Sequence, residues 1–310
     1  MRVFENANYK FLSMRRPAYF VSAAIITIGL ASIALRGGLR MGVEFTGGVL
    51  LEVQFSEETN VGQIRDALTA GGTTGVQITQ LRAVAQATND FLLRVPVGAD
   101  EDQNEVRDQI RQSLETEFAA GSFDIVRGDT LSAKVGGEFQ RTAIIAVILS
   151  FLLTLIYLAF RFEWRFGVAA VIATVHDMLI TFGFISLFDI EISLATVAAI
   201  LTIIGYSLND TIVVFDRVRE NLRKKRKEPH ETTLDRSLNE TLPRTVLTSG
   251  TTLVSLVSLV VIGGAVIRPF ASVLIVGVLV GTYSSIFVAS PVLVEIHERA
   301  RKRAAIGART

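Results

Sequence analysis

The sequence lacks the features on which most enzymes and metalloproteins depend. It has no cysteine, which excludes a disulfide framework and a thiolate metal site and leaves the redox compartment undefined. Its three histidines, His176, His230 and His297, have no companions at the spacing of metal ligands. No glycine-rich loop ends in Gly-Lys-Ser/Thr, and nothing resembles a nucleophile elbow or a catalytic triad. The sequence therefore predicts no enzyme activity, no metal site and no cofactor.

An excess of charge of one sign is also missing. The chain has 31 Lys and Arg residues against 30 Asp and Glu residues, which gives a net charge of +1. This balance by itself says nothing about acidic partners, and we expect no nucleic-acid partner. The placement of the basic residues along the chain is more informative than their sum.

Long apolar runs are what the sequence has instead. Six runs of about 18 residues or more carry few or no charges, which is the length needed to cross a hydrocarbon core about 30 Å thick. We therefore expect membrane-spanning helices at 17–35, 142–160, 167–188, 194–215, 246–266 and 270–294. A signal peptide is the alternative for the first run. Its length and the lack of a small-x-small cleavage site before Arg36 favour an uncleaved helix.

The positions of Lys and Arg in the short connections set the orientation of the helices. Basic residues precede the first run, separate the second from the third and the fourth from the fifth, and follow the sixth. The alternate connections carry none at 189–193 and only Arg268 between the last two runs. We therefore expect residues 1–35 to hold a cytoplasmic N-terminus and the first helix. A cytoplasmic loop at 217–243 and a cytoplasmic basic tail at 295–310 are expected as well.

A second basic feature lies inside the expected loop, at residues 223–227, which are all Lys or Arg. We interpret this run as a solvated loop that helps to set the topology. Contact with anionic membrane lipids is the additional role that such a run can have.

The stretch 36–141 is long enough to form a domain on the opposite side of the membrane, and 142–294 holds the five later helices. The pattern of residues 36–141 predicts a strand, a helix, two strands, a helix and a strand, at 49–55, 61–70, 76–84, 91–97, 102–119 and 122–126. This βαββαβ order is typical of a ferredoxin-like sandwich, with two helices on an antiparallel sheet. The expected fold class is an all-α six-helix membrane bundle with one α+β domain outside it.

Ionisable residues inside the predicted helices are the candidates for function, because charge in a membrane is costly. Asp210 lies in the fourth helix, about 9 Å further into the membrane than Asp216. Arg244 opens the fifth helix from the same side, and Thr248 follows it by one turn. An ion pair between Asp210 and Arg244 would either lock the bundle or make the proton affinity of the aspartate depend on the distance to the arginine.

Other polar and small residues extend this region. His176 and Asp177 lie near the middle of the third helix, and Asn209 precedes Asp210; hydrogen bonding between helices is the alternative to a functional role. On the sixth helix Gly277, Gly281 and Ser285 recur every four residues, a spacing that lets helices approach closely.

Four segments resemble the SecF family of protein-export membrane subunits, and the resemblance spans the whole chain. They are Gly42–Gly48 (with Glu44, Phe45, Gly47 and Gly48), Val175–Asp177, Ser207–Arg217, and Leu242–Thr245 with Thr248–Thr252. The long match in the fourth helix is the most specific, whereas the glycine segment alone is weak. The family usually has aspartate where Glu44 stands, which keeps the charge and differs by one methylene group.

The resemblance implies a multi-pass subunit of the bacterial inner membrane, with a periplasmic outer domain. It implies pairing with SecD, cooperation with the SecYEG channel, and use of the proton motive force to draw unfolded preproteins outward. The fold implied is half of a resistance-nodulation-division transporter, and the implied proton pathway comprises Asp210, Arg244 and Thr248.

Three alternatives stay open at this point. The chain is a small-molecule exporter of the same superfamily, or it is a scaffold that stabilises its partner without transducing energy, or the coupling ion is sodium. A drug exporter should carry two repeats and two large outer domains in one chain, and this sequence has one copy of each.

The orientation can be tested with a reporter fused after Thr310 that is active only in the cytoplasm. We expect activity, because all the basic connections lie on the side of this terminus. A fusion that was active only outside the cytoplasm would overturn the predicted topology.

Overall fold

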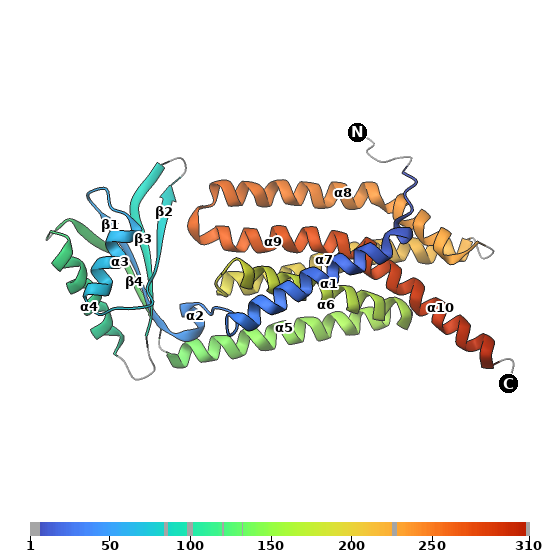
Figure 1. Ribbon diagram of the computed structural model, residues 1–310, viewed down its shortest axis with the longest axis horizontal. Helices are drawn as coiled ribbons and strands as arrows, with labels where there is room; N and C mark the ends of the chain where they lie inside the picture. Colours follow the sequence, from blue (N-terminus) through green and yellow to red (C-terminus); the bar gives the residue numbers. More distant parts are fainter. Residues whose placement is uncertain are drawn as a thin grey trace.

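Six long apolar helices run along the longest axis of the molecule, and a small sheet with two helices lies at one end of them (Figure 1). The computed structural model describes residues 7–83, 86–97, 102–119, 121–131, 133–224 and 228–307. Both ends of the chain lie at the end of the bundle away from the sheet. We call this the distal end of the bundle, and the other the sheet-side end.

The six predicted spans are confirmed, because each of these helices is long and apolar enough to cross a membrane. After a 3₁₀ turn at Phe11–Met14, five of them are α1 Arg15–Leu35, α5 Ala133–Arg161, α6 Trp164–Leu187, α7 Leu194–Lys224 and α8 His230–Ile262. The sixth consists of α9 Gly264–Ser284, a π-helical turn at Ser285–Ala289 and α10 Ser290–Gly307.

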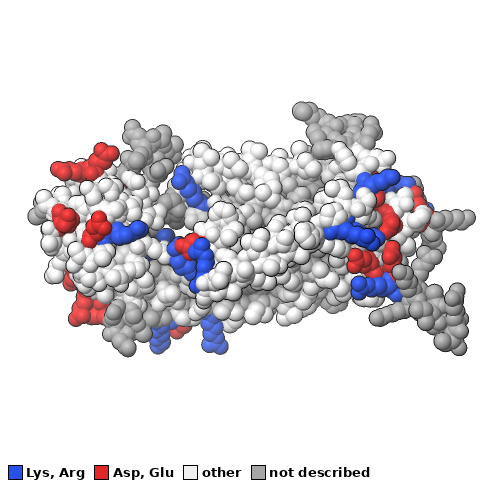
Figure 2. All heavy atoms as spheres, viewed as in Figure 1, with Lys and Arg blue, Asp and Glu red and all other residues white. Residues whose placement is uncertain are grey.

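The outer surface of the bundle suits a lipid environment. Large apolar side chains point outward on several helices, for example Phe20 on α1, Leu153 on α5 and Val254 on α8, which are 76%, 56% and 69% exposed. Figure 2 shows that, on the face drawn, charged side chains gather over the sheet and toward both ends of the bundle and leave a broad middle band uncharged. An uncharged band of this kind is expected where helices meet hydrocarbon.

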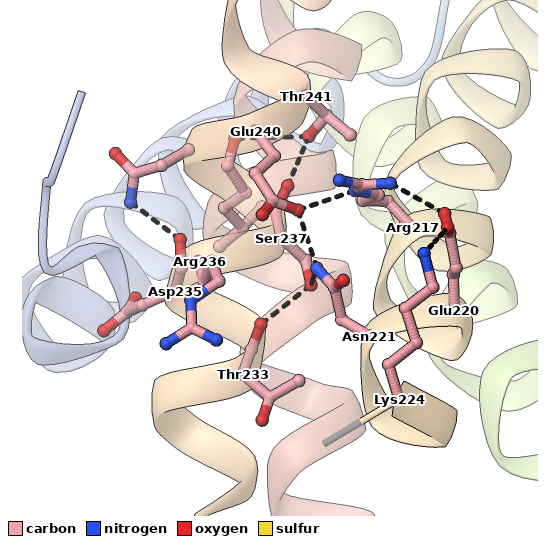
Figure 3. A network of polar contacts seen from close by, with 12 residues as sticks. Arg217, Glu220, Asn221, Lys224, Thr233, Asp235, Arg236, Ser237, Glu240 and Thr241 are labelled. Carbon is pink, nitrogen blue, oxygen red and sulfur yellow. Dashed lines mark hydrogen bonds and ion pairs between the residues drawn. The ribbon is translucent and has the colours of Figure 1, made fainter. Parts of the chain in front are cut away.

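The distal parts of α7 and α8 form a charged helical hairpin, where the sequence analysis placed a loop at 217–243 (Figure 3). Polar side chains of the two helices pair with each other and support the helical extensions. Arg217 Nε donates to Glu240 Oε2 at 2.6 Å, and Asn221 Nδ2 donates to Ser237 Oγ at 3.0 Å. Hydropathy marks only the apolar part of each helix, so it ended both helices too early.

The basic segments are only partly described. Residues 225–227 of the basic run and residues 308–310 of the tail lie outside the described residues. The rest of the tail predicted at 295–310 is not a separate segment, because α10 continues the sixth span as helix through Gly307.

The fifth span ends before the predicted limit of residue 266, because the chain turns at two glycines between α8 and α9. Gly264 has a φ of +69°, a conformation that side chains with a Cβ rarely adopt. A Cβ on Gly263 would lie 2.3 Å from the carbonyl oxygen of Leu259. Both positions therefore require glycine.

The sheet domain has the predicted βαββαβ order. Its elements are β1 Gly48–Phe55, α3 Val61–Ala70, β2 Gln77–Ala83, β3 Gln86–Pro96, α4 Gln103–Glu117 and β4 Phe123–Leu131. The strands pair antiparallel in the order β2-β3-β1-β4, the ferredoxin-like arrangement that the sequence predicted. The last strand ends at Leu131, so residues 133–141, assigned to this domain from the sequence, are the first turns of α5.

The sheet domain has a hydrophobic core of its own between the sheet and its two helices. Side chains of β1, β3, α3 and α4 meet there with no exposed surface, among them Leu51, Val53, Phe91, Ile64 and Ile110. The helix α3 begins with a capping box between Asn60 and Gln63, which satisfies its first free N–H groups. The domain therefore does not depend on the bundle for its core.

We expect the segment 48–131, expressed alone, to unfold in one cooperative transition. Val53→Ala should lower its free energy of unfolding by about 1.5–3 kcal/mol, because Val53 is fully buried. The matched control Val126→Ala, at a strand position that is 58% exposed, should change it by less than about 0.5 kcal/mol. Equal effects of the two substitutions in denaturant titrations, or no cooperative transition, would contradict this description of the core.

Candidate functional site

The sixth span packs closely on α7 through small residues. Residues four apart on one helix face residues four apart on the other, in the pairs Gly277–Ile203, Gly281–Ser207 and Ser285–Thr211. A Cβ on Gly277 would lie 2.2 Å from Cγ1 of Ile203, and the hydroxyls of Ser285 and Thr211 are hydrogen-bonded at 2.9 Å. The three small residues singled out from the sequence thus lie on one face against α7. This contact brings the polar residues of α7 against the sixth span.

Asp210 lies in α7 near this contact, and only 9% of its surface is exposed. Its Oδ1 accepts a hydrogen bond from the hydroxyl of Thr245 on α8 at 2.7 Å. Its Oδ2 is buried and accepts no hydrogen bond of normal geometry; the hydroxyl of Ser285 lies nearby and is paired with that of Thr211 at 2.9 Å. A carboxylate oxygen that has lost water without gaining a partner is costly in an apolar bundle. A proton or a cation that reached this oxygen would remove that cost.

The expected ion pair between Asp210 and Arg244 is not formed in this structure. Arg244 is exposed on the outer face of α8, and it has no ion pair among the described residues. Thr245 faces Asp210 instead, and adjacent helical residues point about 100° apart. Thr248 is also exposed, on the same side as Arg244. The guanidinium still lies close enough to Asp210 to act on it electrostatically.

Thr245 is the contact that the sequence analysis missed. Thr241, Thr245 and Ser249 recur every four residues on α8, and all three are buried. Ser249 Oγ lies 2.6 Å from the hydroxyl of Thr282 on the sixth span. The regular spacing of these hydroxyls was the available signal, because a buried polar stripe on a membrane helix marks the face that contacts other helices.

Asp177 lies at the centre of the bundle with 0% of its surface exposed, and its oxygens are fully partnered. Its Oδ1 lies 2.9 Å from Nδ1 of His176. Its Oδ2 accepts hydrogen bonds from the hydroxyls of Ser207 on α7 and of Ser284 on the sixth span. The other ring nitrogen of His176 lies 3.0 Å from the hydroxyl of Ser22 on α1.

The hydrogen bonds continue beyond Ser22. Its hydroxyl lies 3.1 Å from that of Tyr283, which donates to the carbonyl oxygen of Ala18 at 2.8 Å. The network thus joins α1, α6, α7 and the sixth span. Because each of its polar groups has a partner, it supports the structural alternative for Asp177 more than an exchange role. Of these two aspartates, Asp210 is the one that has an oxygen without a hydrogen-bond partner.

An irregular stretch of helix lies beside both carboxylates. The π-helical turn Ser285–Ala289 begins one residue after Ser284, the hydroxyl of which binds Asp177. The hydroxyl of Ser290, the first residue of α10, donates to the carbonyl oxygen of Ser285 at the start of the turn, at 2.9 Å. Turns of this type are frequent at functional sites and allow a helix to change its local register.

A polar face on α7 and α8 points out of the bundle. Its exposed members are Asn209, Arg244, Thr248, Thr251, Ser255 and Ser258. Polar and ionisable side chains in spanning helices face protein or water rather than lipid. This outer polar face therefore suits contact with a second membrane protein, next to Asp210.

The glycine segment lies at the sheet-side end and forms the link between the first span and β1. Glu44 and Phe45 belong to the short helix α2, Val43–Thr46, and Phe45 is only 5% exposed in the core at this end of the bundle. Gly47 and Gly48 have φ values of +80° and +156°, which explains the glycines. Figure 1 shows α2 between the bundle and the sheet.

Two histidines come together at the distal end, which their spacing did not indicate. The ring centroids of His230 and His297 lie 4.1 Å apart. The guanidinium of Arg165 lies 3.2 Å from Nδ1 of His297, which opposes a cation there. Within the described ranges, no group of three or more His, Cys, Asp or Glu residues is placed to hold a metal ion.

Comparison with known proteins gives consistent results. The profile of the family described as "Protein export membrane protein SecD/SecF, C-terminal" matches residues 110–299, and that of the "SecD/SecF GG Motif" matches residues 34–58. The chain is 46% identical to the protein translocase subunit SecF of Gemmatimonas aurantiaca, over 96% of this chain and 90% of that one. It is 41% identical to SecF of Rhodothermus marinus, over 98% of both chains.

A solved structure is similar in fold as well. The crystal structure of SecDF from Thermus thermophilus, a translocon-associated membrane protein, matches 96% of this chain with a TM-score of 0.81 at 35% identity. The match covers 40% of the SecDF chain, so this chain spans less than half of that protein.

The small-residue contact can be tested with two Gly→Ala substitutions. In Gly281→Ala the new Cβ would lie 3.1 Å from the backbone of α7 at Ser207, so the helices must separate, at a cost of about 1–3 kcal/mol. Gly205→Ala is the matched control, because no atom lies within 4 Å of its Cβ position. Alanine there should leave stability unchanged or raise it by up to about 1 kcal/mol.

Thermal unfolding of the purified variants in the same detergent separates these cases. Gly281→Ala should have the lower midpoint and Gly205→Ala should not. If the two variants had the same midpoint of thermal unfolding, close packing of α7 on the sixth span would not be what stabilises this part of the bundle.

Proposed function

We propose, on the premise that this chain belongs to the SecD/SecF family of protein export membrane proteins, that it is a proton-driven subunit of a protein translocase. It works with SecD and the SecYEG channel and promotes the outward movement of unfolded preproteins. Its work is transport rather than covalent catalysis. The relatives named SecF and SecDF support the translocase assignment, and the buried carboxylate of Asp210 supports the energy source.

The single observation that carries the proton role is the half-satisfied state of Asp210. Thr245 holds one of its oxygens, and the other is buried without a partner. A fully bonded carboxylate such as Asp177 must break several hydrogen bonds before it exchanges a proton. Asp210 can accept a proton on its free oxygen and keep the bond from Thr245. One charge that crosses a potential of 100 mV supplies about 2.3 kcal/mol, enough to shift a two-state equilibrium about fiftyfold.

Arg244 is the group that makes the proton affinity of Asp210 depend on conformation. Arg244 is the residue next to Thr245, and adjacent helical residues point about 100° apart, so a rotation of α8 by up to about 100° would exchange the hydroxyl for the guanidinium at the carboxylate. A guanidinium beside a carboxylate favours the ionised form, and its departure favours protonation. A cycle of approach and departure would take up a proton on one side of the membrane and release it on the other.

The outward polar face supports SecD as the partner that completes this site. The match of this chain covers 40% of the SecDF protein from Thermus thermophilus, the name of which joins SecD and SecF. Arg244, Thr248 and their exposed polar neighbours would be covered by SecD rather than by lipid. Thr248 would then line the proton path at the contact between the two proteins.

The location that fits this function is the bacterial inner membrane, with the sheet domain in the periplasm. Both termini lie at the distal end, opposite the sheet, and the basic hairpin and tail lie there too (Figure 1). By the distribution of Lys and Arg, that end is cytoplasmic. Apolar side chains on the free faces of the helices contact membrane lipids.

The proton role predicts that Asp210→Asn abolishes the gradient-dependent part of preprotein export. The amide keeps the size of the side chain and its bond from Thr245 but does not titrate. A neutral amide in the membrane costs less than a lone carboxylate, so insertion, abundance and SecD association should stay nearly intact. The measurement is export into vesicles that contain this chain, SecD and SecYEG, with and without a proton gradient. Arg244→Met should stop coupling as well.

Asp216→Asn is the matched control on the same helix, because Asp216 is paired with Arg161 at 2.5 Å, outside the buried site. It should retain gradient-dependent export. A scaffold would instead show lost assembly as its first defect. Full gradient-dependent export by assembled Asp210→Asn complexes would exclude the relay.

A further inference from the structure

A second pair of carboxylates lies where the sheet domain joins the bundle. The segment before α2 is attached to the connection between α6 and α7 by backbone hydrogen bonds. The N–H of Gly42 donates to the carbonyl oxygen of Ile192, and the N–H of Ile192 donates to that of Arg40, both at 2.8 Å. This attachment brings Glu44 of α2 to Glu191 of the connection, two residues that are distant in sequence.

The two carboxylates share one small space. A Cβ on Gly42 would lie 2.5 Å from Oε2 of Glu44 and 2.8 Å from Oε1 of Glu191, so both oxygens flank the position that glycine leaves free. These same two oxygens are buried and have no hydrogen-bond partner. The side chain of Glu191 is 11% exposed. Two ionised carboxylates facing each other in this way would repel without water to separate them.

The surrounding positive charge does not balance the pair. Nη1 of Arg94, on β3, lies 3.7 Å from Oε2 of Glu191, the other oxygen of that carboxylate. Arg40 acts on Glu191 at longer range, but it is bound to Asp189 at 2.6 Å. Arg36 pairs with Asp189 as well, so the charge of Asp189 is already matched by two arginines. Among the described residues, the guanidinium of Arg94 is therefore the one that forms an ion pair with either carboxylate of the Glu44–Glu191 pair.

We propose that Glu44 and Glu191 form a proton-binding site, in which one proton shared between the two carboxylates holds the sheet domain against the bundle. The proton comes from solvent, forms an O–H bond on one carboxylate and is donated in a hydrogen bond to the other. This inference goes beyond the proposed function, because it needs neither Asp210 nor export. Carboxylate pairs that share a proton are a known consequence of like charges at close range.

The electrostatic balance at Glu191 supports this assignment. Burial raises the pKa of Glu191 above its ordinary value, and the Glu44 carboxylate adds to this; Arg94, Arg40 and the backbone N–H of Val43 oppose the rise without reversing it. Glu191 belongs to the bundle, whereas Arg94 belongs to the sheet domain and Glu44 to the link between them. Because the pKa of Glu191 is raised when the sheet domain is docked, protonation stabilises the docked arrangement. This stabilisation is fully present at pH values below the ordinary glutamate pKa. It is lost as the pH rises through the raised value.

The absence of cysteine makes the docking directly measurable. Spin labels on cysteines introduced at Thr116 of α4 and Ser258 of α8, both exposed, report the distance between the sheet domain and the bundle. The protein is held in lipid nanodiscs without a gradient, at about pH 4, just below the ordinary glutamate pKa, and at about pH 8. We expect one narrow distance distribution at the lower pH and a second, broader population at the higher pH.

Glu191→Gln and Glu44→Gln should keep the narrow distribution at both pH values, because each removes the repulsion. Glu57→Gln, an exposed carboxylate of the same domain, should behave as the unsubstituted protein does, and so should Asp210→Asn. Infrared titration of the unsubstituted protein should show one carboxyl group that stays protonated at pH values above the ordinary glutamate pKa. This signal should be missing in Glu191→Gln and in Glu44→Gln.

Several results would overturn the proposal. They are a distribution that does not change with pH, a change that persists in both pair variants, or a change that Asp210→Asn abolishes. A dependence on sodium at fixed pH would assign the site to a cation instead. Since none of these readouts involves export, they are independent of the fate of the Asp210 relay.

Discussion

The close approach of the sixth span to α7 is the contact on which the membrane site depends. Gly281 lets the backbones meet, and the residues around it then have no space for lipid or water. Hydroxyl and carboxyl groups in such a contact must find partners among themselves, because the bilayer offers none. The hydrogen bonds around Asp177 follow from this requirement, and so does the isolation of Asp210 beside them.

Two buried carboxylates on adjacent helices thus receive different surroundings. Asp177 is enclosed by donors from three helices and fixes their arrangement. Asp210 has one donor, one free oxygen and a guanidinium nearby that is not yet bound to it. Ser207, which bonds to Asp177, lies three residues before Asp210 on α7, so a fully partnered carboxylate and a half-partnered one are close together in the bundle.

Sequence reasoning found the parts of this protein that rest on local signals. The six spans and the βαββαβ order follow from apolar runs and from alternation along strands, which neighbouring residues determine. The charged hairpin was missed because Arg217 and Glu240 support it across two helices. Asp210 was identified from its cost in the membrane, but Arg244 was assigned as its partner instead of Thr245 because the rotation of α8 is set by tertiary packing. The approach of Glu191 to the glycine segment depends on the whole fold and has no signal in the sequence.

The central claim is that a proton passes through the carboxyl group of Asp210. The most direct measurement is proton flux into vesicles that contain this chain and SecD, driven by an imposed gradient and followed with an internal pH indicator. We expect a flux that Asp210→Asn removes and Asp216→Asn leaves in place. An equal flux in the Asp210→Asn and unsubstituted complexes would contradict it.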